Sequence, residues 1–265
     1  MSEFPRTLKA WRTRRRYSQL DLALEARVSA RHVSFLETGR ARPSPEMVAR
    51  LGEALDMPLE ARNQMLTHAG FAARYPGRKW DAEEMAPIRR AVDRLLERHM
   101  PYPALAVDRL WTVLEANAAA RWLFGALGCG VGDSLLDLML SDRLPEVIEN
   151  FPDVAHHAAS RLRTESAAQG GVAELDRVSE VLFARSAAGL SSGDDRVGSG
   201  PPPASPGPVI PTIMRLGEQR LALFATIAQF GTPGDVALDD LKIELYFPLD
   251  EPSREILERF AADPA

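Results

Sequence analysis

The segment from Ser18 to Ser44 carries the densest set of helix start and stop signals in this chain of 265 residues. Ser18, Ser29 and Ser44 each stand directly before an apolar, helix-periodic stretch, where a serine hydroxyl can accept a hydrogen bond from a free amide of the first turn. Gly39 ends the middle stretch and Pro45 opens the last one, as is typical of a helix end and a first helical turn. These signals predict short helices joined by tight turns, with no strand.

The same pattern extends to both sides of this segment. We expect helices over residues 5–15, 19–26 and 30–38, a fourth helix from Pro45 through Leu55, and a fifth that opens at Pro58 and closes at Gly70. The sequence therefore predicts an all-α domain over residues 1–70. Residues 71–99 are expected to form a linker and a connecting helix.

Charge is divided unevenly between the two parts of the chain. Residues 1–58 hold 11 basic and 7 acidic side chains, a net charge of +4, whereas the remainder holds 21 basic and 30 acidic side chains, a net charge of −9. A basic module suits a polyanionic partner such as nucleic acid. The alternative is that the basic run at residues 12–16 is only the solvated end of a helix.

Several classes of protein are disfavoured by what the sequence lacks. A single cysteine, Cys129, excludes an internal disulfide framework and a multi-cysteine zinc site, and we expect it to be a neutral loop residue. The adjacent His156 and His157 point about 100° apart on a helix, so we expect no metal site. Without a phosphate-binding glycine loop, a GxSxG or an HExxH motif, we expect neither an enzyme nor a cofactor. No apolar run or signal peptide points to a membrane, so we expect a cytoplasmic protein.

The second half of the chain mixes strands with helices. We expect a hairpin of strands 104–107 and 111–114, helices over 117–124, 133–140, 144–168 and 172–188, strands 209–216 and 220–230 around Gly217-Glu218, a strand 242–247 and a helix 253–260. Residues 189–208 are rich in Gly, Ser and Pro and predict a disordered loop. The fold class is therefore α+β, with a second domain over residues 100–262.

The N-terminal signals resemble those of the Cro and phage-repressor helix-turn-helix, the XRE family. The resemblance covers about residues 6–58 and rests on Ser18-Gln19, Leu22-Ala23, Ala26, Val28-Ser29 and Leu36-Glu37-x-Gly39-Arg40-x-x-Pro43. Small side chains at Ala23 and Ala26 permit two helices to cross closely, and Val28 can fill the core beneath the turn. The resemblance implies that the helix beginning after Ser29 enters the major groove of DNA.

Roles for individual residues follow from this resemblance. Arg31 is the expected base reader because a guanidinium can bind guanine in a bidentate way, the alternative being a phosphate contact. Ala30 could touch a thymine methyl group, and Phe35 either faces DNA with only an apolar contact or belongs to the core. The remaining expected DNA contacts are His32 and Ser34 near the groove, and Gln19, Arg40 and Arg42 at phosphates. The resemblance also implies that Arg12 and Glu37 form a structural ion pair, which removes Arg12 from the DNA contacts.

A second resemblance covers about residues 88–262. The residues Tyr102-Pro103-Ala104, Val107-Asp108-Arg109-x-Trp111-x-Val113, Asn117, Phe230-Gly231-Thr232-Pro233-x-Asp235-Val236 and Glu244-x-x-Phe247-Pro248 resemble the ligand-binding domain of MmyB-like transcriptional regulators. That domain is PAS-like, a small antiparallel sheet packed with helices, and members of the family have been suggested to bind fatty acids. The stretch 189–208 departs from the pattern as an insertion ahead of the strand at 209.

A sensor domain of this kind needs a cavity between sheet and helices. We expect it to be lined by Trp111, Val113, Ala120, Phe124, Ile213, Leu223 and Ala225, although each of these could instead fill a core. Few charges are expected to face inward, which favours a small and largely apolar ligand, such as an acyl or aromatic compound.

Together these features predict a sequence-specific, dimeric transcription regulator that binds a pseudo-palindromic DNA operator and responds to a small ligand. The alternative is a DNA-binding antitoxin or adaptor whose C-terminal domain holds a protein partner. An apolar, sheet-rich second domain favours the ligand, because antitoxins commonly use a short or disordered segment for their partner.

Overall fold

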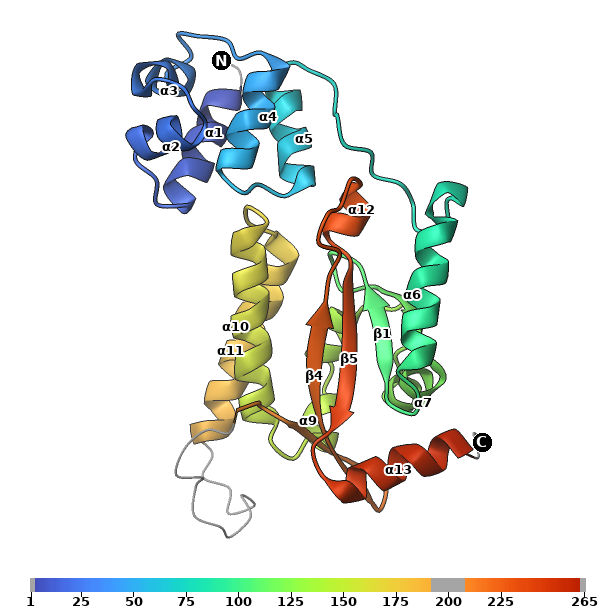
Figure 1. Cartoon of the computed structure of the whole chain (residues 1–265). Helices are drawn as coiled ribbons and strands as arrows, with labels where there is room; N and C mark the ends of the chain where they lie inside the picture. Colours follow the sequence, from blue (N-terminus) through green and yellow to red (C-terminus); the bar gives the residue numbers. More distant parts are fainter. Residues whose placement is uncertain (1–2, 192–207, 263–265) are drawn as a thin grey trace. The chain divides into compact units, whose positions relative to one another are not determined.

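The computed structural model describes residues 3–191 and 208–262. The chain divides into two compact units. Unit 1 comprises residues 1–78 together with 164–172 and 232–239, and unit 2 comprises residues 79–163, 173–231 and 240–265. Each unit is built around its own set of secondary-structure elements (Figure 1).

Unit 1 contains the five short helices that the capping signals predict. They are α1 (Phe4–Arg14), α2 (Gln19–Glu25), α3 (Ala30–Glu37), α4 (Pro45–Ala54) and α5 (Leu59–His68), and the short α12 (Val236–Asp239) also belongs to this unit. The hydroxyls of Ser18, Ser29 and Ser44 each accept a hydrogen bond from the backbone N–H of the third residue of the helix that follows. Gly39 has φ +72°, the left-handed conformation in which a side chain would be strained, and it ends α3.

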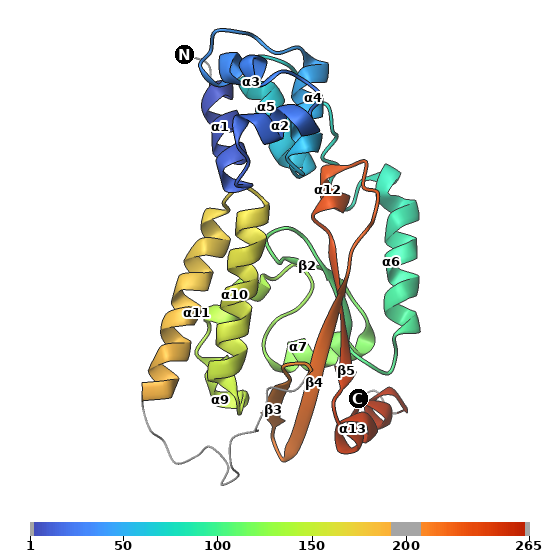
Figure 2. The same ribbon diagram turned by 60° about the vertical axis from the view of Figure 1, so that its left-hand side comes forward.

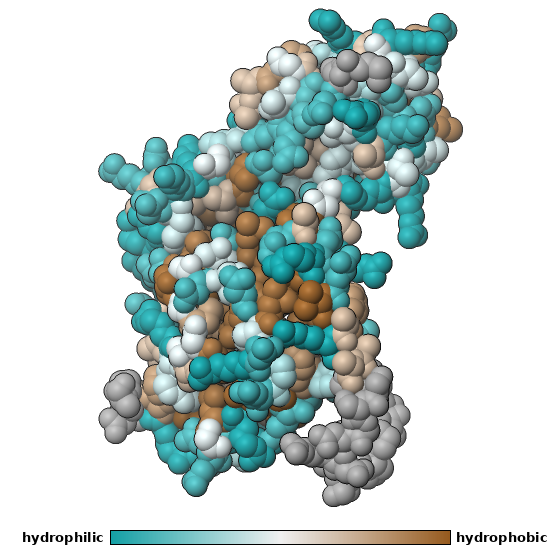
Figure 3. Space-filling model, turned by 180° about the vertical axis from the view of Figure 1, so that it is seen from behind, coloured by the Kyte–Doolittle hydropathy of each residue, from teal (hydrophilic) through white to brown (hydrophobic). Residues whose placement is uncertain are grey.

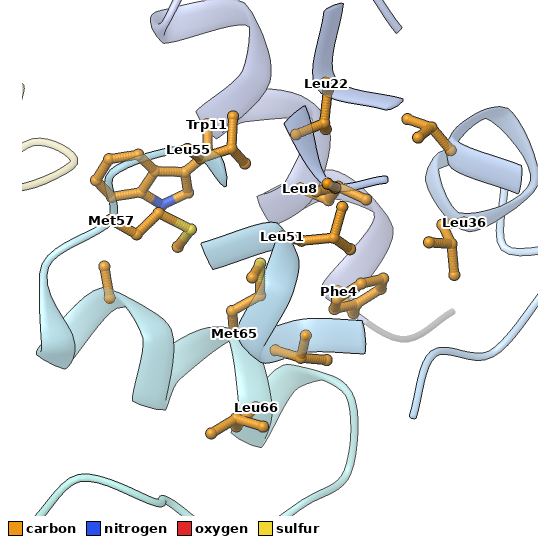
Figure 4. Packing of buried hydrophobic residues seen from close by; sticks show 14 of the residues in the cluster. Phe4, Leu8, Trp11, Leu22, Leu36, Leu51, Leu55, Met57, Met65 and Leu66 are labelled. Carbon is orange, nitrogen blue, oxygen red and sulfur yellow. The ribbon is translucent and has the colours of Figure 1, made fainter. Parts of the chain in front are cut away.

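The core of unit 1 lies where these helices meet (Figure 4). Leu8 of α1, Leu22 of α2, Leu36 of α3 and Leu51 of α4 are all fully buried. Burying each such side chain contributes roughly 1.5–3 kcal/mol, so helices too short to be stable alone are stabilised by their common apolar face.

Unit 2 is a five-stranded antiparallel sheet packed with helices. Its strands are β1 (Ala104–Val107), β2 (Val113–Ala116), β3 (Thr212–Leu216), β4 (Gln219–Ala228) and β5 (Lys242–Pro248), in the order β2-β1-β5-β4-β3. Its helices are η1 (Glu83–Met85), α6 (Ala86–Arg98), α7 (Ala118–Ala126), α8 (Leu135–Leu140), α9 (Arg143–Val147), α10 (Phe151–Ala168), α11 (Ala173–Ser191) and α13 (Glu251–Ala262), although residues 164–168 of α10 are assigned to unit 1. The predicted α+β class is confirmed.

The two faces of this sheet carry different side chains. Because side chains alternate along a strand, Lys242, Glu244 and Tyr246 of β5 share one face, and Phe247 lies on the other. We call the face of Lys242, Glu244 and Tyr246 the inner face. Its helices include α7 and α10, whereas the end of α6 lies against the opposite face, where the rings of His99 and Phe247 meet edge to face. Figures 1 and 2 both show α10 and α6 on different sides of the strands.

Asn117 joins four segments of unit 2 through its buried amide. Its Oδ1 accepts hydrogen bonds from the amides of Ala104 and Ala120, and its Nδ2 donates to the carbonyls of Leu96 and Tyr102. Since all four hydrogen-bonding positions of the amide are used, these bonds offset the cost of removing it from water. This residue fixes the end of α6 and the start of β1 against α7.

Three expectations about local structure need correction. The single helix expected over 144–168 is interrupted, because Ile148 leaves the helix to form a bridge with Met214 of β3 and the chain returns to helix at Phe151. The strand expected from 111 begins at Val113, since Trp111 adopts φ +63°. Helix α11 continues to Ser191, three residues into the stretch predicted as a disordered loop, and residues 192–207 of that prediction lie outside the described residues.

Candidate functional sites

Helix α3 exposes one face and buries the other. Val33 and Leu36 are at 0% relative exposure and point into the core of unit 1. Arg31 is exposed, and the other predicted groove residues, Ala30, His32 and Ser34, are partly exposed. The buried pair therefore turns the N-terminal part of α3 outward, as insertion into a major groove requires.

Arg12 and Glu37 lie against each other between α1 and α3. Arg12 donates through Nε to Oε1 of Glu37 at 2.6 Å and through Nη2 to Oε2 at 3.0 Å, and its Nη1 donates to the carbonyl of Tyr17 at 2.6 Å. Burial opposes ionisation of Glu37, but the hydrogen bonds from Arg12 and Gln19 outweigh it and hold the pKa of this carboxyl below its usual value. The guanidinium of Arg12 therefore makes its hydrogen bonds within unit 1.

Gln19, a predicted phosphate contact, is held by the same carboxylate. Its Nε2 donates to Oε2 of Glu37 at 2.8 Å, which fixes the direction of the amide at the start of α2. The second hydrogen of the amide group can still donate outward. Glu37 therefore joins α1, α2 and α3 through one side chain.

Phe35 is not part of the apolar core of unit 1. It is partly exposed on α3, and the guanidinium carbon of Arg31 lies 5.1 Å from the centre of its ring. This removes the core alternative for Phe35 and gives Arg31 a neighbour on the outward face.

Arg40 and Arg42 follow α3 and are both exposed. In the ranges that the structure describes, neither guanidinium takes part in a hydrogen bond or an ion pair. Two cations beside the end of an outward-facing helix suit contacts to a phosphate backbone.

The predicted pocket residues of unit 2 differ in their exposure to solvent. Trp111, Val113, Ala120 and Leu223 are buried, Phe124 and Ile213 are partly buried, and Ala225 is exposed. Ala225 pairs with Tyr246 on the inner face, and the ring of Phe124 contacts that of Tyr246 at 5.7 Å between centres.

Ile213 does not lie on the inner face with Leu223 and Ala225. It pairs with Ala222, and successive residues of a strand point to opposite faces, so Ile213 lies on the other face of the sheet from Leu223 and Ala225. Ile213 and Leu223, which were both expected to line one cavity, therefore face opposite sides of the sheet.

Charged side chains line the inner face, contrary to the expectation that few would point inward. Lys242 and Glu244 are only 2% and 3% exposed. Glu244 forms an ion pair with Arg161 of α10 at 2.7 Å and accepts a hydrogen bond from the hydroxyl of Tyr246 at 2.6 Å. Burial and the neighbouring carboxylate raise the pKa of Tyr246, so its phenol stays protonated.

The ring of Trp111 contacts both cations of this cluster. Its ring centre is 4.2 Å from the guanidinium carbon of Arg161 and 4.3 Å from Nζ of Lys242. Cations over an aromatic face are stabilised by the ring quadrupole, particularly away from water. The inner face therefore combines a polar cluster with apolar neighbours such as Leu223 and Ala225.

Part of the apolar surface of unit 2 reaches solvent. Ile227, which pairs with Glu244 on the inner face, is 43% exposed. In the space-filling view, apolar side chains gather in the middle of the face of unit 2 that is turned to the reader (Figure 3). Exposed apolar surface of this kind is typical of a binding surface rather than a closed core.

Two models of known protein families match this chain. Residues 8–61 match the helix-turn-helix family model, and residues 88–260 match the MmyB-like transcription regulator ligand binding domain. The second match covers about two thirds of the chain. The chain belongs to the MmyB-like transcription regulators. No curated protein matches it significantly.

Membership in the MmyB-like regulators confirms the family expected from the sequence. The chain is a DNA-binding transcription regulator with a ligand-binding domain, and both matched families are regulatory binding domains rather than enzymes. No helix in the described ranges is long and apolar enough to span a membrane.

Sequence reasoning missed the polar cluster of this MmyB-like domain. The alternation Lys242, Glu244, Tyr246 in a strand was a usable signal, because three polar residues at a spacing of two share one face. Nothing local in the sequence points to Arg161, which lies 83 positions from Glu244 along the chain and meets it only in the fold.

A separate recess of about 340 Å³ lies near Cys129, with Asp133, Asp137 and Arg143 in its lining. Burial and the two carboxylates raise the pKa of the Cys129 thiol, so it stays protonated rather than nucleophilic. His156 and His157 have ring centres 5.8 Å apart, and no group of three metal-ligating side chains occurs within residues 3–191 and 208–262.

Proposed function

We propose that this regulator binds a specific sequence of double-stranded DNA through α3 and that a small, mainly apolar ligand in unit 2 modulates the binding. The observation that supports the DNA part best is the orientation of α3. Its buried residues Val33 and Leu36 face the core, which leaves Arg31 exposed at its N-terminal end.

Each residue of the proposed DNA surface has a distinct role. Arg31 contacts the edge of a guanine, and Ala30, His32 and Ser34 complete the groove surface. Gln19, Arg40 and Arg42 contact phosphates, which set the register of the protein on the duplex without reading its sequence. The net charge of +4 over residues 1–58 supports attraction to the backbone.

We infer that the regulator acts as a homodimer on a pseudo-palindromic operator. A single short helix reads only a few base pairs, so two recognition helices about 34 Å apart would read one turn of DNA from the same side. The ligand would act by changing the relative populations of dimers that can and cannot bind DNA.

The proposed ligand site lies on the inner face of the sheet. Its apolar part consists of Trp111, Val113, Ala120, Phe124, Leu223 and Ala225. The cluster of Arg161, Lys242, Glu244 and Tyr246 would meet a polar group at one end of the ligand. A mainly apolar molecule with one polar group suits this combination.

Selection of duplexes from a random library by the full-length protein tests the DNA-binding proposal. We expect one enriched site, and on that site the variant Arg31→Ala should relax the preference at one base position per half-site by about 1–3 kcal/mol. A uniform loss on all sequences would move Arg31 to the phosphate contacts, and no enriched site would refute sequence-specific binding.

A further inference from the structure

We propose that Phe35 is a specificity-determining residue: its ring reads the methyl group of a thymine next to the guanine bound by Arg31, and it positions the guanidinium for that guanine. This inference rests on the proposed DNA-binding function. It concerns which bases α3 reads, not whether α3 enters the groove.

The helical positions of the two residues place them together on the outward face. Four residues of an α-helix turn through about 400°, so Arg31 and Phe35 lie about 40° apart around the axis and about 6 Å apart along it. Val33 and Leu36 occupy the buried side. A face that reads DNA through Arg31 therefore also presents Phe35.

The contact between the two side chains limits the freedom of Arg31. The guanidinium carbon lies 5.1 Å from the ring centre of Phe35, within the range of a cation–π interaction. Within the described ranges, the guanidinium of Arg31 has no hydrogen bond or ion pair that would hold it elsewhere. The ring is thus the neighbour that orients it before DNA arrives, which reduces the entropy lost on binding.

The chemistry of the major groove selects the bases. A guanidinium pairs with O6 and N7 of guanine, and the only apolar group at a base edge is the C5-methyl of thymine. A ring that packs on the guanidinium and lies about one helical turn from Arg31 reaches an adjacent base pair rather than the same one. Phe35 offers no hydrogen bond, so a thymine methyl is the group that it can recognise.

The test uses the full-length protein and the site obtained by selection. Each thymine next to the guanine read by Arg31 is replaced by uracil, which removes only the methyl group, and affinities are measured by fluorescence anisotropy. We expect uracil at one position per half-site to weaken binding by the wild type about fourfold, as for the loss of one buried methyl group. The variant Phe35→Ala should bind the thymine and uracil duplexes equally.

Two further variants separate reading from positioning and guard against a folding defect. Phe35→Leu keeps an apolar side chain without an aromatic face, so it should still distinguish thymine from uracil but lose roughly two- to fivefold in its preference for guanine. Phe35→Tyr keeps the ring and should retain both preferences. Neither variant should change the slope of log affinity against log salt, because the phosphate contacts remain.

A positive control uses cytosine at the same position, which lacks the methyl group and should weaken binding. Replacing that cytosine by 5-methylcytosine should then restore binding. Two results would overturn the inference while leaving DNA binding intact: an equal effect of uracil on wild type and Phe35→Ala, or loss of the uracil effect in Ala30→Gly instead. Failure to select any site would instead refute the proposed function itself.

Discussion

Removing the charge of Glu37 should destabilise unit 1 far more than its small chemical change suggests. The side chains of Glu37 and Arg12 are 3% and 13% exposed, and Glu37 accepts from both Arg12 and Gln19. The variant Glu37→Gln keeps the shape but leaves the Arg12 guanidinium partly buried without its counter-charge. Breaking a completely buried pair in this way costs about 3–5 kcal/mol, which is a factor of roughly 150 to 5,000 in the opening equilibrium, and the partial exposure of Arg12 places this pair toward the lower end.

Hydrogen–deuterium exchange at pH 7 measures this cost within the intact chain, in peptides from residues 4–68. Arg6→Ala is the matched control, because it removes an ion pair with Glu3 whose side chains are 72% and 59% exposed. That change should cost under about 1 kcal/mol. Equal protection in wild type and Glu37→Gln would refute a stabilising role for the pair.

The same pair makes a directional prediction about pH. The pKa of Glu37 is lower in the folded protein than its ordinary value of 4.5, so its contribution is present above pH 4.5 and lost as pH falls through the folded pKa. In urea titrations, the difference in free energy of unfolding between wild type and Glu37→Gln should become smaller as the pH is lowered from 7 to below 4.5. A gap that widens on acidification would contradict the assignment.

Two other predictions concern the DNA backbone and the ligand. Arg40→Ala and Arg42→Ala should each weaken binding to all sequences alike and flatten the slope of log affinity against log salt by about one unit, so an unchanged slope in both would exclude phosphate contacts. A ligand that binds only the folded protein adds about 2.7 kcal/mol to the free energy of unfolding at a hundred times its dissociation constant, which raises the melting temperature. Ala120 is fully buried in α7, and Ala120→Trp should abolish the rise that acyl or aromatic compounds produce, while operator binding persists. Native mass spectrometry and a thermal-shift screen supply this measurement, and no co-purified molecule and no shifting compound would favour a protein partner for unit 2.

The local sequence alone determined most of unit 1. Ser18, Ser29 and Ser44 cap helices through hydrogen bonds to residues three positions away, and Gly39 ends α3 through its own backbone conformation. Such signals act within one helical turn, so they can be read without the fold. The alternation of apolar residues likewise located the strands of unit 2 and its α+β class.

Only the tertiary structure decided which side chains meet. The ion pair of Arg161 with Glu244 depends on the packing of α10 against the sheet, and the break in the helix at Ile148 depends on its bridge to Met214. The placement of Ile213 on the face opposite Leu223 depends on the register of β3 against β4. The sequence equally left open whether Phe35 faces DNA or belongs to the core, until packing placed it on the outward face beside Arg31. Local propensity specifies the elements, but register and burial are set by the free energy of the whole packed unit, to which residues far apart in the chain contribute together.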